Sequence, residues 1–450
     1  MPTRKQILNL FCCAFFTAAW IASVAAQDDA SQWKVRPLAQ DYVLVCRSPD
    51  PANVYCYTPG LARCPNGRLI ATMELGGKVK EKKPKPVKGS GSAMVMVSDD
   101  HGKTWQYRTN FKIGHARPFI AGDSVYILGQ SGDLRVMRSD DWGDTWTEPV
   151  TLTDGQKWHQ SACNVHYAKG NVYLVMEKRL SRNVTAWGGW GVSEFAPVLL
   201  RGKIGDDLTK RESWTFASDL VFNEAVKDKE LDWFGVPFYP AFYPEGWNAA
   251  WLRSCAPIGW LESNVVQIVD PDNYWYDPKG CTFHIWMRAH TGGTNFAAMC
   301  KAVEKDDGTI ETMLETVPSG KRIVFVPCPG GQMRFHILYD ETTKLYWLLS
   351  SQSTDSMTRA DKLQADRYNL PNNERHRLQL HFSRNCIDWC FAGLVAVGDS
   401  PKQSRHYASM IIDGNDLHIL SRSGDAQAKS AHDGDMITFH TVRDFRRLVY

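Results

Sequence analysis

Long apolar runs are scarce in this chain of 450 residues. The one clear run covers residues 7–24 and follows Arg4 and Lys5. It ends in Val24-Ala25-Ala26, the kind of small-residue ending that signal peptidase reads. We therefore predict a leader over residues 1–26, cleaved after Ala26, and a secreted or periplasmic protein. No other run is apolar enough to span a bilayer, so we expect no membrane contact after cleavage.

An excess of charge of either sign is also missing. The chain has 52 Lys and Arg against 49 Asp and Glu, a net charge of +3. This balance lacks the basic excess that nucleic-acid-binding domains show, so no nucleic acid partner is expected. Paired Cys-x2-Cys units are absent, so no structural zinc is indicated. We predict no metal and no cofactor at the site, and a calcium ion held by Asp or Glu carboxylates stays an open question.

Twelve cysteines are present, of which Cys12 and Cys13 fall in the predicted leader. The even number that remains permits disulfides in an exported protein. Ten cysteines allow too many pairings for the sequence to choose among them. The oligomeric state is equally open.

Helical periodicity is nearly absent as well. Instead, short runs alternate apolar and polar residues, for example over 68–72, 124–128 and 171–175. A turn pair such as Asn66-Gly67 or Lys169-Gly170 stands just ahead of such runs. Many short strands with regular turn signals predict an all-β protein.

One octapeptide occurs twice in nearly identical form. Residues 98–105 read Ser-Asp-Asp-His-Gly-Lys-Thr-Trp, and residues 139–146 read Ser-Asp-Asp-Trp-Gly-Asp-Thr-Trp. A degenerate copy covers 383–389, and a weaker one ends at Trp214. The Asp is expected to accept backbone N–H groups in a tight turn, with Trp packed between neighbouring sheets. These copies resemble the Asp-box of sialidases and related β-propellers.

The resemblance implies an all-β fold with six four-stranded antiparallel blades. A spacing of about 40–50 residues between repeats is typical of propeller blades. We expect residues 27–450 to form a single domain of this kind, with a long, Trp-rich insertion near residues 180–260 that overhangs the channel. The six blades are predicted to open near the following residues: Tyr57, Arg117, His159, Glu262, Arg334 and Tyr407.

Ligands of propellers bind where the innermost strands begin, because six strand starts converge there. These starts are rich in polar residues in this chain. The candidate substrate-binding residues are Tyr57, His115, Arg117, Arg334 and Arg405. His159 and His406 are candidate acid–base groups at the same starts.

The resemblance to sialidases also implies a catalytic pair. Residues 405–409, Arg-His-Tyr-Ala-Ser, are similar to the strand that carries the sialidase nucleophile, which makes Tyr407 the candidate. Residues 260–266 are similar to the strand that carries its glutamate partner, which makes Glu262 the candidate base. The family binds the substrate carboxylate with three arginines; Arg288 matches one of them, and Arg375, or alternatively Arg377, matches another. A guanidinium fork suits a carboxylate because it donates two parallel hydrogen bonds.

Two features of that family are missing here. Tyr57 stands where the first arginine of the three is expected. The family's acidic aspartate is absent too, because no Asp occurs between Asp50 and Ser98. A histidine or Glu74 would then have to serve as the acid.

Three functions follow as hypotheses. The first is an exo-acting glycoside hydrolase for an acidic sugar or glycan, similar to an exo-α-sialidase. The second is a lyase for uronic-acid polysaccharides, in which a histidine or Tyr407 removes the proton beside a neutralised carboxylate. The third is a propeller that binds an acidic glycan without turnover. Fold alone does not separate them, but carbohydrate is the expected partner in each.

Overall fold

The computed structural model describes residues 35–77, 93–180, 192–228, 230–232, 259–289, 295–354 and 374–450. The chain divides into two compact units, residues 1–37 and 38–450. The predicted leader lies outside the described residues, and the account below concerns the second unit. Among the residues described, no helix has the length and apolarity to cross a membrane.

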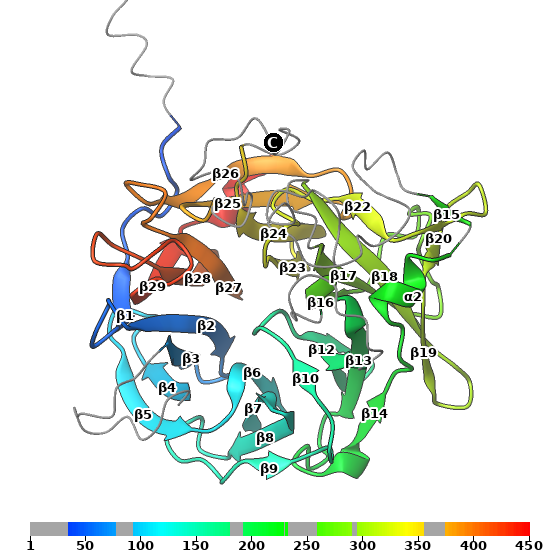
Figure 1. Ribbon diagram of the computed structural model, residues 1–450, viewed down its shortest axis with the longest axis horizontal. Coiled ribbons are helices and arrows are strands. Elements are labelled where there is room, and N and C mark those ends of the chain that lie inside the picture. Colours follow the sequence, from blue (N-terminus) through cyan, green and yellow to red (C-terminus); the bar gives the residue numbers. More distant parts are fainter. Residues whose placement is uncertain are drawn as a thin grey trace, which may run out of the picture. The chain divides into compact units, whose positions relative to one another are not determined.

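Six antiparallel sheets succeed one another along the chain and surround a central axis (Figure 1). The first contains β2 (Val54–Arg63), β3 (Leu69–Gly77), β4 (Ala93–Ser98) and β5 (Gln106–Phe111). The second contains β6 (Gly114–Ala121), β7 (Ser124–Ser131), β8 (Asp133–Ser139) and β9 (Val150–Thr151). The third contains β10 (Trp158–His159), β11 (His166–Ala168), β12 (Asn171–Arg179), β13 (Phe195–Lys203) and β14 (Trp214–Phe216).

The remaining sheets continue the pattern. The fourth contains β16 (Trp260–Val266), β17 (Thr282–Ala289), β18 (Phe296–Glu304), β19 (Ile310–Met313) and β22 (Phe325–Pro327). The fifth contains β23 (His336–Asp340), β24 (Leu345–Ser351), β25 (Arg377–Ser383) and β26 (Cys390–Val397). The sixth contains β27 (Arg405–Asp413), β28 (Asp416–Ser423), β29 (Met436–Val442) and β1 (Val43–Arg47). The predicted six-bladed β-propeller is confirmed.

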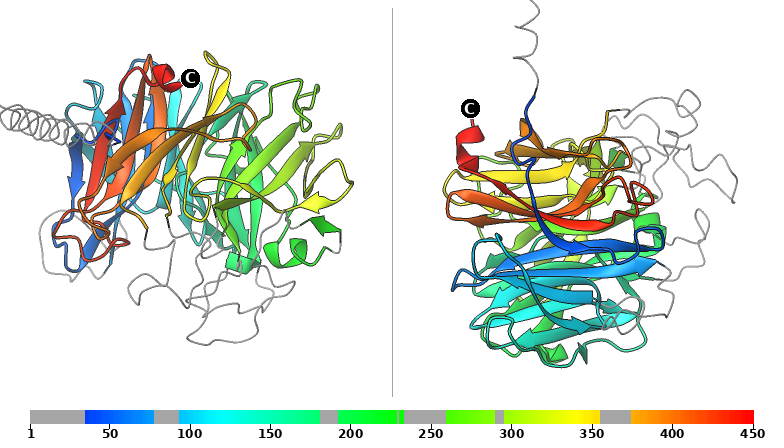
Figure 2. Two further views of the ribbon diagram at one scale, coloured as in Figure 1. Left: turned by 90° about the horizontal axis from the view of Figure 1, so that it is seen from above. Right: turned by 90° about the vertical axis from the view of Figure 1, so that its left-hand side faces the viewer.

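The ring is closed by pairing two distant parts of the chain. β1, near the N-terminus, runs antiparallel to β29, with Val43 opposite Phe439. The last sheet therefore contains strands from both ends of the second unit. Figure 2 shows the sheets from the side, with their strands running from one end of the ring to the other. Large apolar side chains fill the space between neighbouring sheets, as where Trp347 packs edge-on against Phe445, with ring centroids 4.9 Å apart.

The predicted insertion near residues 180–260 is wrong in part. The middle of this stretch is part of a propeller blade, because β13 and β14 are the outer strands of the third sheet. Trp260, counted among the insertion's tryptophans, is fully buried in β16 and donates its indole N–H to the Phe195 carbonyl at 2.7 Å. The apolar run over residues 195–200 is typical of a buried strand, but the Trp and Gly residues on either side of it suggested an insertion. Trp214, also in that stretch, is buried in β14. The remaining tryptophans of that stretch, residues 187, 190, 233, 247 and 251, lie outside the described residues.

A few short elements complete the fold. They are the 3-10 helices η1 (Val192–Glu194), η2 (Arg211–Ser213) and η5 (Phe445–Leu448), the helix α2 (Phe222–Ala225), and the strands β15 (Leu231–Asp232), β20 (Glu315–Thr316) and β21 (Arg322–Ile323). The last three form a small sheet of their own. All nine described cysteines are free thiols.

Both octapeptides form the expected turn between the third and fourth strands of a sheet. In the first, Thr104 N–H donates to Asp100 at 2.9 Å and Gly102 N–H donates to the Ser98 hydroxyl at 2.8 Å. The second repeats these contacts from Thr145 and Gly143. The residue before each glycine has a φ of 59° or 58°, and Cys386 in the degenerate third copy has 59°. The three turns thus share one local conformation.

The first of these turns also packs across the interface between the first and sixth sheets. Trp105 lies edge-on to the ring of Phe439 in β29, with centroids 5.4 Å apart. Gly102, at a φ of +83°, lies directly on the same ring, so a Cβ there would overlap Phe439. The turn therefore needs glycine both for its backbone conformation and for the close approach.

We expect Gly102→Ala to lower the free energy of unfolding by about 2–4 kcal/mol, from left-handed strain and overpacking together. Gly170→Ala is the matched control, because Gly170 has a φ of +70° but a Cβ added there would meet no atom within 4 Å. That control isolates the strain alone. Urea unfolding of both variants measures the difference, and equal losses would show that contact with Phe439 contributes nothing.

Candidate active site

Four innermost strands carry the same irregularity near their first residues. Each has a β-bulge with a non-glycine residue at positive φ, namely Thr58 (40°), His115 (53°), Glu262 (60°) and Tyr407 (50°). Such a conformation costs on the order of 1–3 kcal/mol and persists where the surroundings enforce it, often at functional sites. We call the end of the channel marked by these four residues the mouth.

Tyr407 and Glu262 meet at the mouth through one arginine. Arg288 Nη1 donates to the Tyr407 hydroxyl oxygen at 2.8 Å and lies 3.4 Å from Glu262 Oε2. Its Nε donates to the Gln332 carbonyl at 2.9 Å, which fixes the guanidinium. All three side chains are at least 95% buried, so their charges interact in a medium of low polarity. Burial raises the pKa of the Tyr407 phenol, more than the charge of Arg288 lowers it, so the phenol is neutral at neutral pH.

Arg375 lies over the same phenol ring, with its guanidinium carbon 5.5 Å from the ring centroid. Its Nη1 donates to Nδ1 of His406 at 2.9 Å. Burial lowers the pKa of Arg375 to about 10, which leaves it charged at neutral pH. Burial also lowers the pKa of His406 well below its ordinary range, so the imidazole accepts this bond in its neutral form. His406 therefore orients Arg375 in this arrangement.

A third arginine at the mouth, Arg422, was not predicted. It is fully buried on β28, with its guanidinium carbon 4.2 Å from the Tyr57 ring centroid and 5.6 Å from that of Tyr407. Its Nη2 donates to the His432 carbonyl. Its Nε and Nη1 are buried and have no hydrogen-bond partner among the described residues. Tyr57, which replaces the expected first arginine, therefore supports an arginine from another sheet.

The strand pairing at the four β-bulges follows a common pattern. In the inner strand pairs, the residue just before each bulge faces a polar residue on the second strand: Leu261 faces Arg288, and His406 faces Arg422. Tyr57 faces Glu74 in the same way, and Gly114 faces Gln130. Prediction from the sequence covered the starts of the innermost strands, so it missed Arg422 and Gln130 of this second row, whereas Arg288 and Glu74 were already candidates. A polar residue at the matching place of each hairpin is the signal that identifies it.

Glu74 lies on the first-sheet side of the mouth and touches His115. His115 N–H donates to Glu74 Oε2 at 3.4 Å, and the His115 Nε2 lies 3.6 Å from Oε1. Gln130 Nε2 lies 2.5 Å from Nδ1 of His115 and holds the ring from its other side. Burial raises the pKa of Glu74 to about 7, although the His115 N–H and the charge of Arg422 oppose the shift. This carboxyl therefore holds its proton to much higher pH than an exposed glutamate does.

His159 continues the ring of polar groups on the third sheet. Its ring meets that of His115 edge-on at 5.2 Å, and its Nδ1 lies 3.3 Å from Oε2 of the fully buried Glu177. The other Glu177 oxygen accepts from the Ser263 hydroxyl at 2.6 Å, directly after Glu262 in the chain. This contact ties His159 to the strand that carries the candidate base.

The other predicted arginines lie away from the Tyr407 hydroxyl. Arg334 lies under the Tyr407 ring at 6.0 Å and donates to the Ser409 hydroxyl at 2.9 Å. Arg117 donates to the backbone carbonyls of Ser161 and Val175. Arg405 donates to two carbonyls and lies over the ring of Tyr42 at 5.4 Å. Arg117 and Arg405 thus donate mainly to backbone carbonyls, and their role in substrate binding stays a prediction.

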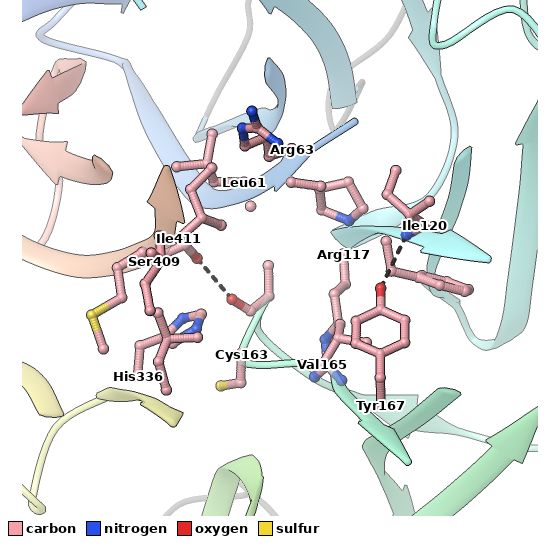
Figure 3. Close-up of a pocket in the computed structure, with 18 residues that line it drawn as sticks. Leu61, Arg63, Arg117, Ile120, Cys163, Val165, Tyr167, His336, Ser409 and Ile411 are labelled. Atoms are coloured by element: carbon pink, nitrogen blue, oxygen red, sulfur yellow. Dashed lines mark hydrogen bonds between the residues drawn. The ribbon is translucent and has the colours of Figure 1, made fainter. Parts of the chain in front are cut away.

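A cavity of about 310 Å³ lies further along the inner strands. Figure 3 places Arg117, Cys163, His336 and Ser409 around it, with apolar side chains such as Ile411 beyond them. Neither Tyr407 nor Glu262 lines this cavity. It belongs to the channel past the mouth, and the polar groups described above are concentrated at the mouth itself.

No protein-family model matches the chain, and no curated protein matches it either. Solved structures do match the chain. A Dyadobacter fermentans protein of unknown function is 13% identical, with 90% of this chain and 98% of that chain covered and a TM-score of 0.50. The Hadza microbial sialidase Hz136 is 14% identical, with 89% of this chain and 68% of that chain covered and a TM-score of 0.52. The chain thus has the fold of the sialidase-like β-propellers.

Proposed function

We propose that this protein is an exported glycoside hydrolase that removes an acidic sugar from the end of a glycan. The observation that supports this most directly is the single nitrogen of Arg288, which contacts both the Tyr407 hydroxyl and the Glu262 carboxylate. The fold shared with a sialidase is consistent with the proposal but does not by itself assign an activity.

The arginines at the mouth define the substrate class. Arg288, Arg375 and Arg422 all lie around the Tyr407 ring, and the Glu262 carboxylate contacts Arg288 there. Two nitrogens of Arg422, Nε and Nη1, are buried without a hydrogen-bond partner among the described residues. A buried guanidinium is stabilised when an anion completes its hydrogen bonds. A sugar carboxylate beside the reacting carbon meets this need, so we infer an acidic sugar as the substrate.

The same charge explains a tyrosine nucleophile. A carboxylate nucleophile would be repelled by the substrate's own carboxylate, whereas the phenol of Tyr407 is neutral until it reacts. Glu262 takes the phenol proton as the Tyr407 oxygen bonds to the anomeric carbon and the leaving oxygen departs. Arg288 stabilises the developing phenolate through the hydrogen bond it already makes. Water then hydrolyses the glycosyl–tyrosine intermediate, which gives retention at the anomeric carbon.

Glu74 is the proposed general acid. It lies on the first sheet, where the sialidase resemblance places an acid, and its raised pKa keeps a proton available near neutral pH. In the first step it donates this proton to the leaving oxygen, and in the second it accepts one from the attacking water. His115 and Gln130 position it. His159 supports the Glu262 strand through Glu177 and Ser263.

A panel of sialosides, uronic-acid polysaccharides and sulfated glycans tests the proposal. Hydrolysis releases a reducing sugar without ultraviolet absorbance from an unsaturated uronate. A lyase would produce that absorbance, and a binding protein would retain glycan without any product. Release of an acidic monosaccharide with retained anomeric configuration is the expected result, and either other pattern contradicts the proposal.

Arg422→Met provides a test of the carboxylate site. We expect KM for the acidic substrate to rise by about 10–100-fold, because a charge-assisted hydrogen bond contributes roughly 1.5–3 kcal/mol. Tm should not fall, because the substitution removes a buried cation that has no carboxylate partner among the described residues.

Arg211→Met is the matched control for that variant. Arg211 stacks on Phe216 at 3.8 Å, on the third sheet and away from the mouth. Its loss should leave KM unchanged. Steady-state kinetics on both variants measures the difference, and an unchanged KM in Arg422→Met would remove Arg422 from the substrate site.

A further inference from the structure

Three potential metal ligands meet where the ring is closed, at the opposite end of β27 from Tyr407. Asp413 ends β27, His418 lies in the following strand β28, and His101 stands in the first octapeptide turn. In the part of the chain that the structure describes, this is the one group of three His, Cys, Asp or Glu side chains whose ligand atoms all lie within 4.8 Å of one another. His101 is 312 positions from Asp413 in sequence, so no local sequence motif indicates this group.

The spacing of these atoms suits a small divalent ion. His101 Nδ1 lies 2.9 Å from Asp413 Oδ2, and His418 Nε2 lies 3.3 Å from the same oxygen. Tetrahedral zinc, with bonds of about 2.0–2.1 Å, places neighbouring ligand atoms about 3.3 Å apart. His101 is exposed, so its side chain is free to adjust by the small distance that an ion requires.

Outer contacts orient each ligand for this role. Asp413 Oδ1 accepts from Arg63 Nε at 2.7 Å, which leaves Oδ2 toward the two imidazoles. The Nδ1 of His418 lies 3.3 Å from the Thr441 hydroxyl, so Nε2 is the nitrogen presented to Asp413. Hydrogen bonds of this kind on the far side of a ligand are typical of metal sites.

The surrounding charges nearly cancel. Arg63 forms an ion pair with Asp413. Asp416, whose charge acts on His418, forms an ion pair with Arg443. An ion bound at Asp413 Oδ2 would thus meet two carboxylates and two guanidiniums, without a net excess of positive charge. Two imidazole nitrogens and one carboxylate oxygen favour zinc or a similar transition ion over calcium, which prefers oxygen ligands.

We propose that His101, Asp413 and His418 bind one Zn²⁺ ion, with water at the fourth position. The ion joins the first sheet, through the turn that carries His101, to the hairpin of the sixth sheet. It stabilises the ring at the seam where Gly102 and Trp105 also pack on Phe439. The site is separate from the mouth, so this proposal neither needs nor supports the proposed hydrolase activity.

Zinc titration of the full-length protein, freed of metal with a chelator, tests the site. We expect calorimetry to show one ion per chain and Tm to rise by about 2 °C or more at saturation, because the ion binds the folded state more tightly than the unfolded chain. With Co²⁺ in place of Zn²⁺, the visible absorption of a four-coordinate site is expected.

His101→Ala should abolish the calorimetric binding, the Tm increase and the cobalt spectrum. This residue is exposed, so the variant is expected to fold. Lys103→Ala, an exposed change in the same turn, is the matched control and should retain all three signals. The proposal is overturned if the parent protein binds no zinc, or if His101→Ala binds it with unchanged affinity.

Discussion

Tyr407→Phe is expected to lower kcat on the hydrolysed substrate by at least about a thousandfold. The substitution removes the one oxygen that the proposed mechanism places on the anomeric carbon, and loss of a catalytic nucleophile typically costs this much or more. The hydroxyl is also where Arg288 directs its 2.8 Å hydrogen bond. Steady-state kinetics with the substrate found in the panel measures the effect.

The fold should tolerate this change. The Tyr407 phenol is neutral in the folded protein, so phenylalanine alters no charge. The ring also keeps its place among Arg334, Arg375 and Arg422, whose guanidinium carbons lie 5.5–6.0 Å from its centroid. Arg288 retains its bonds to Gln332 and Glu262. Binding of the acidic product should therefore change only a few-fold.

Tyr126→Phe is the matched control for the loss of a buried phenol hydroxyl. Tyr126 packs between the second and third sheets, stacked on Phe119 with ring centroids 5.5 Å apart. We expect this variant to keep full activity. If Tyr407→Phe retains more than about a tenth of the activity while its fold and product binding are intact, the nucleophile lies elsewhere and the mechanism fails.

The fold could be predicted from local patterns because propeller turns are defined locally. The Ser, Asp, Gly, Thr and Trp of each octapeptide contact one another within eight residues, so the sequence carries the whole turn. The spacing of the repeats also predicted that Tyr407 and Glu262 lie on blade-opening strands. The outer strands β13 and β14 were harder to predict, because Gly and Trp residues between 180 and 260 suggested an insertion.

The site was only partly predictable because its residues meet across sheets. Arg422 lies at the mouth on the second strand of the sixth sheet, and its position becomes clear only once the register of the hairpin, with His406 opposite Arg422, is known. Its partner Tyr57 is over 350 residues away in the chain, and their contact depends on ring closure. Glu74 was visible as a candidate, but its raised pKa depends on burial that only the assembled mouth provides.

Glu74→Gln is the second large effect we expect. Without its acid, the enzyme should lose about 10²–10³-fold in kcat/KM on a natural glycoside, whose leaving oxygen needs a proton. An aryl glycoside of the same sugar has a leaving group that departs without one, so its turnover should fall less than about tenfold. Comparing the two substrates separates loss of the acid from loss of the site as a whole.

The pH profile supplies an independent measure of the same carboxyl. A general acid acts in its protonated form, and the pKa of Glu74 is raised to about 7. For the parent protein, kcat/KM on the natural glycoside should therefore begin to fall as pH approaches 7 and approach a tenfold decrease per pH unit on the alkaline side. With the aryl glycoside this alkaline decline should be much weaker, because departure no longer depends on the proton.

Thermal stability provides the control for Glu74→Gln. A simple structural defect would lower Tm, whereas loss of a buried anion is expected to leave Tm unchanged or raise it. A carboxyl whose pKa is raised on folding contributes most to stability below its unfolded value near 4.5, and that contribution is lost as pH rises toward 7. At pH 8 the parent protein holds a buried anion that glutamine replaces with a neutral amide of the same shape. Tm at pH 8 should thus be equal or higher in the variant. A lower Tm together with equal losses on both glycosides would mean that Glu74 supports the fold of the mouth and does not act as the acid.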